Sequence, residues 1–147
     1  MGTLSYESRI ELAPGAENNG LASMLSALIL QNLNDKPAKR TDFAKLRGRI
    51  AIVAEDAGVS LTLVFEGNML TLHDGIVGVP DVTVRANSDD IVQLSLVEIS
   101  PLLGLPNPRG EAMRQVMQKS KRGDIRVFGA LLHFPLVLRL TRLMSIH

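Results

Sequence analysis

The segment at residues 131–146 is too apolar for an ordinary surface helix. Placed at about 100° per residue, its apolar side chains form one broad arc, and a second pair, Phe134 and Leu138, lies on the opposite side beside Arg139 and Arg142. The arc consists of Leu132, Leu136, Val137, Leu140, Leu143 and Met144. At roughly 16 residues, with two arginines inside it, the segment is too short and too charged to cross a bilayer. Its surplus apolar surface must therefore meet a second core layer, a partner chain or a hydrophobic ligand.

Length and composition narrow the class of protein. A chain of 147 residues is expected to form one domain over residues 1–147. It contains no cysteine, which excludes disulfides, thiolate metal sites and a cysteine nucleophile. The N-terminus has no basic start followed by a long apolar run, so we expect no signal peptide and a cytoplasmic location. A formal charge of +1 and only five aromatic residues, none arranged to stack bases, argue against a nucleic-acid binder.

A second very apolar helix is expected near the N-terminus. Asn19 can cap it, and the turn-forming residues 34–37 end it. An optional strand, indicated by Leu4, Tyr6, Ile10 and Leu12, precedes the helix. The apolar positions, which lie nearly all round it, are Leu21, Met24, Leu25, Leu28, Ile29, Leu30 and Leu33.

The middle of the chain has the period of β-structure. Residues 49–55, 60–66 and 69–73 alternate between apolar and polar side chains and are separated by short turns, which predicts an antiparallel meander. A fourth strand is expected at 81–85. One face of the meander carries Leu61, Leu63, Phe65, Leu70 and Leu72.

Two helices and a fifth strand follow. Ser88 is a candidate cap, with Asp89 and Asp90 in the first turn, where the helix dipole favours carboxylates. After a Pro/Gly-rich connection at 102–108, a helix is expected from Pro108, capped by Asn107, to a left-handed Gly123. Ile125 and Val127 then form a strand facing the core, with Phe128 on its other face. The fold class is α+β: a five-stranded, mostly antiparallel sheet with helices packed on one face.

Four features follow one another from Leu46 onward: a Leu-x-Gly-x-Ile pattern at 46–50, paired strands ending near Gly67 and Gly75, a strand-to-helix passage at 80–91, and the strand at 123–129. The resemblance that they carry is to the sterol carrier protein type-two family. It implies helices on one side of the sheet enclosing a hydrophobic tunnel for sterols, acyl chains or isoprenoid lipids. Residues 46–147 would be the core and 1–45 an N-terminal extension with its helix.

The chain is also similar to bacterial members of that family that assist ubiquinone synthesis, which begin with a comparably apolar helix. The segment 96–121 is longer than the connection usual in the family.

The chain has more apolar positions than one face of the sheet can cover. We expect the surplus positions to line the cavity between the sheet and the helices. They are Leu94, Met113, Met117, Phe128, Leu131, Phe134 and Leu138. We expect Arg139 and Arg142 to contact anionic lipid headgroups when Phe134 and Leu138 swing outward, with Gly129 as a hinge and Pro135 weakening the helix start. The alternative is a fixed core helix with solvated arginines.

Catalytic and metal-binding patterns are weak in this sequence. His73, His133 and His147 lack the spacing of metal ligands, and no single element forces a pair of carboxylates together. We therefore expect neither a cofactor nor a metal, and no enzymatic activity.

The residues and the resemblance together predict a non-enzymatic domain that binds and carries a lipid and makes transient contact with membranes. Two alternatives stay open. One is an interaction module whose apolar helices pack against a partner or a second copy of the chain. The other is an accessory domain that works beside an enzyme acting on the bound lipid, as in a quinone-synthesis assembly.

Overall fold

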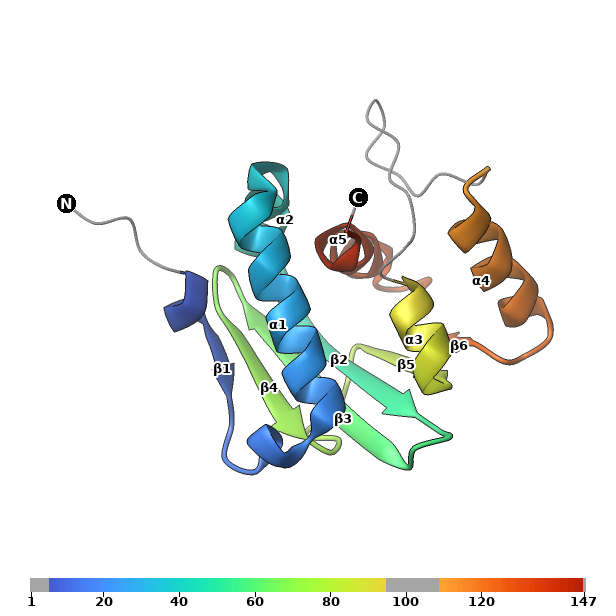
Figure 1. Cartoon of the computed structure of the whole chain (residues 1–147), viewed down its shortest axis with the longest axis horizontal. Coiled ribbons are helices and arrows are strands. Elements are labelled where there is room, and N and C mark those ends of the chain that lie inside the picture. The colour runs from blue at the N-terminus through green and yellow to red at the C-terminus, as the bar shows by residue number, and fades with distance from the viewer. Residues whose placement is uncertain (1–5, 95–108, 147) are drawn as a thin grey trace.

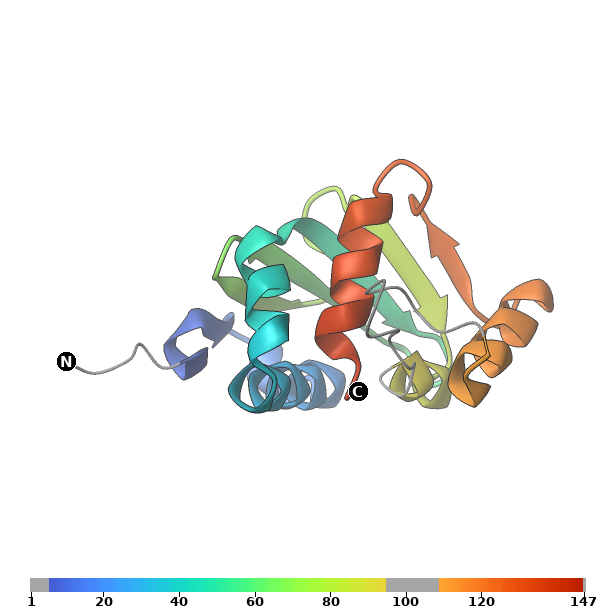
Figure 2. The same ribbon diagram turned by 90° about the horizontal axis from the view of Figure 1, so that it is seen from above.

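The computed structural model describes residues 6–94 and 109–146. They form a six-stranded sheet in the order β1-β4-β3-β2-β5-β6, and the helices gather on one side of it (Figure 1 and Figure 2). The strands are β1 (Ile10–Leu12), β2 (Arg47–Ala54), β3 (Val59–Glu66), β4 (Leu70–Asp74), β5 (Val82–Ala86) and β6 (Arg126–Phe128). The α-helices are α1 (Gly20–Asp35), α2 (Pro37–Lys45), α3 (Ser88–Leu94), α4 (Glu111–Lys121) and α5 (Phe134–Met144), and two short 3-10 helices flank β1 at Tyr6–Arg9 and Ala16–Asn18.

The α+β class is confirmed, with six strands in place of five. The additional strand is β1, which the sequence offered as optional and which pairs in parallel with β4. The meander of β2, β3 and β4 is antiparallel, with Leu63 opposite both Ile50 and Leu72. β5 does not continue the meander: it returns to pair in parallel with β2, and β6 then pairs antiparallel with β5.

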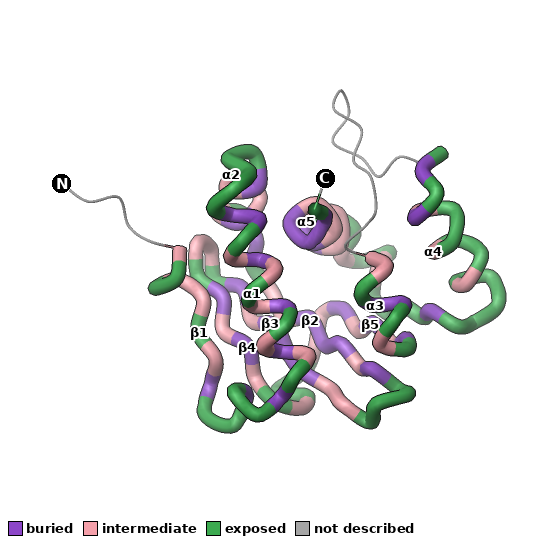
Figure 3. The backbone as a smooth tube through the Cα atoms, viewed as in Figure 1, coloured by how far each residue is buried: buried purple, intermediate pink, exposed green. Residues whose placement is uncertain are grey.

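The core lies between the sheet and helices α1, α2 and α5. The predicted apolar face of β3 and β4 is fully buried, and Ile50 and Ile52 of β2 extend it. Phe43 of α2 packs edge-on against Phe65, with ring centroids 6.4 Å apart. Figure 3 shows this burial concentrated beneath α1 and along the central strands, whereas most of α4 is exposed.

The first helix begins and ends where the sequence predicts. The side chain of Asn19 accepts a hydrogen bond from the backbone N–H of Ala22 at 3.1 Å and donates to the Ser60 carbonyl and to Asp74 Oδ1, both at 2.9 Å. Asn19 thus caps α1 and also fixes its start to β3 and β4. Pro37 was expected only to end this helix; it also begins α2, because proline suits the first turn of a helix.

The later elements differ in detail from the predicted ones. α4 begins at Glu111, three residues after the predicted start, and its expected cap, Asn107, lies outside the described residues. Gly123 adopts the expected left-handed conformation just after α4, with φ of 80°. Leu132 lies before α5 and does not belong to its buried arc.

Candidate functional site

An apolar cavity of about 290 Å³ lies between the β5–β6 end of the sheet and helices α3, α4 and α5. Its lining consists of Val82, Val84, Leu94, Met113, Val116, Val127, Phe134, Val137, Leu138, Leu140, Thr141 and Met144. No charged side chain is among them. The single polar group is the hydroxyl of Thr141, which donates to the carbonyl of Val137 at 2.8 Å. The described part of the wall therefore offers a ligand apolar contact and no unsatisfied polar side chain.

The sheet supplies the floor of this cavity. Val82 and Val84 alternate along β5, so both point to the face that the helices cover. Val127 is opposite Val84 in the antiparallel pairing of β5 with β6, so it lies on the same face. The short valine side chains form the wall on the sheet side, and the longer leucine, methionine and phenylalanine side chains of the helices form the opposite wall.

α5 has two apolar faces, which explains its surplus hydrophobicity. One face carries Leu136 and Leu143 into the core. The other, with Phe134, Val137, Leu138 and Thr141 at intervals of three or four residues, borders the cavity. The second apolar pair found in the sequence thus lines an internal space.

Four of the seven residues predicted to line the cavity do so: Leu94, Met113, Phe134 and Leu138. The other three, Met117, Phe128 and Leu131, are exposed and outside the lining. Phe128 is on the opposite face of β6 from Val127, and Leu131 precedes α5 in the connecting turn. Met117 follows Val116 on α4 by about 100°, which turns it away from the cavity.

Sequence reasoning missed all five valines of the lining and the buried end of α5. The missed lining residues are Val82, Val84, Val116, Val127, Val137, Leu140, Thr141 and Met144. The signal that could have found several of them was the spacing along the last helix: positions 134, 137, 138 and 141 share one face at helical periodicity.

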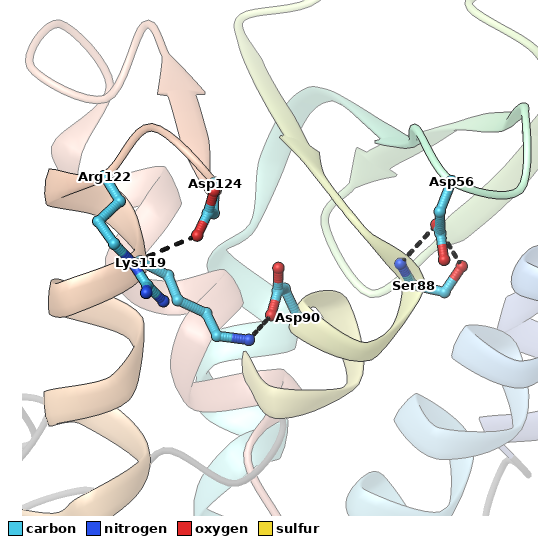
Figure 4. A network of polar contacts seen from close by, with 6 residues as sticks. All are labelled: Asp56, Ser88, Asp90, Lys119, Arg122 and Asp124. Atoms are coloured by element: carbon cyan, nitrogen blue, oxygen red, sulfur yellow. Dashed lines mark hydrogen bonds and ion pairs between the residues drawn. The ribbon is translucent and has the colours of Figure 1, made fainter.

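Polar contacts outside the cavity hold its outer helices (Figure 4). Asp90 of α3 is buried and forms an ion pair with Lys119 of α4, which ties the two helices together. Asp56, in the β2–β3 turn, accepts from the backbone N–H of Ser88 at 2.8 Å and from its hydroxyl at 2.9 Å. These bonds lower the pKa of Asp56, the backbone bond most. The hydroxyl of Ser88, predicted as a cap, therefore donates to Asp56.

The C-terminal half of α5 is fixed to α1 and α2. The amide of Asn32 donates to the carbonyls of Leu143 at 2.9 Å and Ser145 at 3.1 Å, and the ammonium of Lys39 donates to the carbonyl of Arg142. Arg142 Nη2 lies 2.7 Å from Asp42 Oδ1. Arg142, which the sequence analysis assigned to headgroup contact, is thus engaged by the fold itself, whereas Arg139 lines a separate surface groove.

The described residues contain no group of three or more histidines and carboxylates placed to hold a metal ion. Nε2 of His133 lies 3.9 Å from Oδ1 of Asp81, His73 lies in β4, and His147 is outside the described part of the chain. Among those residues, too, no helix is long and apolar enough to span a membrane.

The fold agrees with the comparisons to known proteins. Residues 27–103 match the model of the SCP-2 sterol transfer family. This chain belongs to that family. The match includes α2, the meander, β5 and α3, and it confirms the resemblance seen in the sequence.

Solved structures of family members share the fold. The ubiquinone synthesis protein UbiJ-SCP2 is 22% identical with a TM-score of 0.58, over 84% of this chain and 90% of that one. Sterol carrier protein domain 2 of Helicoverpa armigera is 20% identical with a TM-score of 0.53, over 90% of this chain and 89% of that one. A search of curated protein sequences found no match.

Proposed function

We propose that this protein binds a hydrophobic lipid in the apolar cavity and carries it without catalysing a reaction on it. The observation that supports the proposal is the composition of the wall: twelve lining residues without a charged side chain, on a member of the SCP-2 sterol transfer family. Among the described lining residues the one polar side chain, that of Thr141, is already hydrogen bonded within α5.

The energetics of such a wall suit exchange of the ligand. Burial of a sixteen-carbon chain yields about 12 kcal/mol at about 0.8 kcal/mol per methylene. Association costs of roughly 4 to 15 kcal/mol offset between about a third and all of that gain. A moderate affinity results, as a carrier requires. The wall would also discriminate weakly between tails, because one methylene more or less changes binding by only about 0.8 kcal/mol.

The size of the cavity limits the ligand. A volume of about 290 Å³ is at the lower end of ligand pockets, which extend over roughly 300 to 1000 Å³. We therefore favour a single acyl or isoprenoid chain or one sterol over a lipid with two long tails. The similarity to a ubiquinone synthesis protein makes an isoprenoid quinone precursor a ligand to test. In that case the protein would act as an accessory carrier beside the enzymes that modify the precursor.

The first experiment identifies the ligand. Native mass spectrometry of freshly purified protein, followed by organic extraction, should show a bound lipid that leaves with the solvent. Protein that carries no lipid, and that takes up neither a fluorescent fatty acid nor a fluorescent sterol, would contradict the proposal.

A matched pair of substitutions on α4 tests the location. Met113→Trp places a large ring in the cavity and should weaken binding of a fluorescent fatty acid at least tenfold. Met117→Trp adds the same ring on the exposed side of the same helix and should bind like the parent. Equal affinities for the two variants would show that the ligand binds elsewhere.

A further inference from the structure

The connection between β6 and α5 presents unusually exposed hydrophobic side chains. Leu131 is 97% exposed and Leu132 is 86% exposed, and Phe128 and Phe134 on either side of them are exposed by more than half. We call residues 128–134 the β6–α5 tip. Figure 2 shows this connection as a loop at the outer edge of the molecule. Exposure of two adjacent leucines to water is unfavourable in free energy, and a patch of this kind usually marks a surface that contacts a partner or a membrane.

The backbone fixes the tip in this outward position. Gly129 has φ of 85°, and a Cβ at this position would lie 2.2 Å from the carbonyl oxygen of Asp81, so only glycine allows this close approach. The N–H of His133 donates to the carbonyl of Gly129 at 3.1 Å and closes the turn. Pro135 lies in the first turn of α5, where a proline leaves the helix intact. Gly129 and Pro135 thus define a rigid turn, which does not favour the hinge that the sequence suggested.

A cationic groove adjoins the tip and shares Leu132 with it. Its volume is about 260 Å³, and it is lined by Lys45, Leu46, Arg47, Leu132, His133, Pro135, Leu136 and Arg139. Arg47 donates to the carbonyl of Glu66 at 3.3 Å, and Asp81 lies 3.9 Å from His133. In the described part of the chain, Lys45 and Arg139 form no ion pair with a carboxylate. The groove therefore carries a net positive charge beside an exposed apolar turn.

We propose that the β6–α5 tip inserts into an anionic membrane surface and that the adjoining groove binds lipid phosphate. Exposed leucines flanked by cations fit a bilayer interface, where apolar side chains enter the acyl region and basic ones meet anionic headgroups. Phe134 belongs to the tip and also lines the cavity, so docking would bring the cavity wall to the bilayer. Docking would serve the proposed carriage of a lipid and rests on it in that respect. Binding to vesicles can nevertheless be measured whether or not the cavity holds a ligand.

Single-tryptophan reporters test insertion directly, because the chain contains no tryptophan. Leu132→Trp places the reporter on the tip, and Met24→Trp places it at an exposed residue of α1, which Figure 2 shows at the opposite edge of the molecule. With vesicles of phosphatidylcholine and phosphatidylserine, the tip reporter should shift to the blue and be quenched by brominated acyl chains. The control reporter should show neither change. Equal responses of the two reporters, or none from the tip, would overturn the proposal.

Two pairs of charge substitutions, each of which lowers the net charge of the protein by two, test the groove. The double variant Lys45→Gln, Arg139→Gln should bind these vesicles about tenfold more weakly than the parent at low salt, since each cation near an anionic surface adds to binding. The double variant Arg114→Gln, Lys121→Gln removes two exposed cations of α4 and should bind like the parent. An equal loss in both pairs would indicate general charge attraction and would overturn the assignment of the groove.

Further variants distinguish membrane binding by the tip from dimerisation through the tip and from ligand binding in the cavity. The Leu131→Ser, Leu132→Ser variant should lose at least about tenfold in vesicle binding, and vesicles of phosphatidylcholine alone should bind the parent weakly. Concentration-dependent dimers that disappear in this variant, without vesicle binding by the parent, would assign the tip to a second copy and overturn the proposal. Met113→Trp should bind vesicles normally, so a failure of the cavity assignment is distinguishable from a failure of the tip.

Discussion

Lys39 places a positive charge where water solvates it poorly. Its side chain is only 6% exposed, and its ammonium donates to the carbonyl of Arg142 near the end of α5. The pKa of Lys39 is lowered to about 8, mainly by burial and also by nearby Lys36, while Asp42 partly opposes the shift. A single buried residue thus makes the stability of the fold depend on pH.

The sign of that dependence follows from proton binding. Between about pH 8 and 10.5 the unfolded chain holds a proton on Lys39 that the folded chain has lost, so the free energy of unfolding rises with pH in this window. Across this window Lys39 should raise the free energy of unfolding by on the order of 3 kcal/mol, and the Lys39→Met variant should lack this rise. Urea titrations across this pH range measure it, with Lys121→Met as the control for an exposed lysine. Parallel pH profiles for the parent and Lys39→Met would show that Lys39 is not the source.

At the scale of elements, α5 depends on a side chain from α1. Asn32 is buried and satisfies two carbonyls at the end of α5, those of Leu143 and Ser145. Asn32→Ala removes both bonds and should lower the free energy of unfolding by about 2 to 3 kcal/mol, because buried carbonyls are left without a donor. Gln31→Ala, at an exposed position of the same helix, should change it by less than about 0.5 kcal/mol. Denaturant titration measures both, and similar losses would contradict the role of Asn32.

Local sequence signals predicted where helices and strands lie in the chain better than they predicted which of them contact each other. Asn19, the alternation along β3 and β4, and Gly123 each act through neighbours in the chain, so their roles could be read from the sequence. Contacts between distant segments could not. Arg142 is close to Asp42 only because α5 packs against α2, so its pairing was missed and headgroup contact was predicted.

The same reason explains the partly correct cavity lining. Spacing along α4 shows that Met113 and Met117 lie near one another on the helix surface, but only the packing of α4 against α3 decides which of them faces inward. Phe128 was expected on the outer face of its strand and was still assigned to the lining because it is large and apolar. Its position opposite Thr83, beside the Val84–Val127 pair, confirms the expected face and removes it from the cavity.

At the scale of the whole molecule, one part of the sheet is covered by a well-packed helical layer, whereas the part beside the cavity is covered by helices with few buried side chains. α1, α2 and the C-terminal half of α5 cover β2 to β4 with a continuous buried core. On the cavity side, α4 buries only Ala112 within its bounds and packs mainly against α3 (Figure 3). Few buried apolar contacts mean a low cost of local opening. From this contrast we expect α4, more than α5, to move when a ligand enters or leaves.

Hydrogen exchange should show this division. The amides of α4 are expected to exchange faster than those of α1, and a bound fatty acid should slow α4 more than α1, because the ligand adds apolar contacts to Met113 and Val116. Equal protection of the two helices in the free protein would contradict a mobile α4.

The ion pair between Lys119 and Asp90 should set how readily this wall opens. Lys119→Ala leaves the buried carboxylate of Asp90 unpaired, which costs about 1 to 3 kcal/mol and weakens the attachment of α4 to α3. Stopped-flow release of a fluorescent fatty acid should then become roughly fivefold or more faster, with exchange protection lost in α4 and kept in α1. Lys121→Ala removes an exposed charge from the same helix and should release the ligand like the parent. Faster release together with lost protection in α5 would instead make α5 the moving wall, and the contacts of Asn32, Lys39 and Asp42 would then not be what holds that helix.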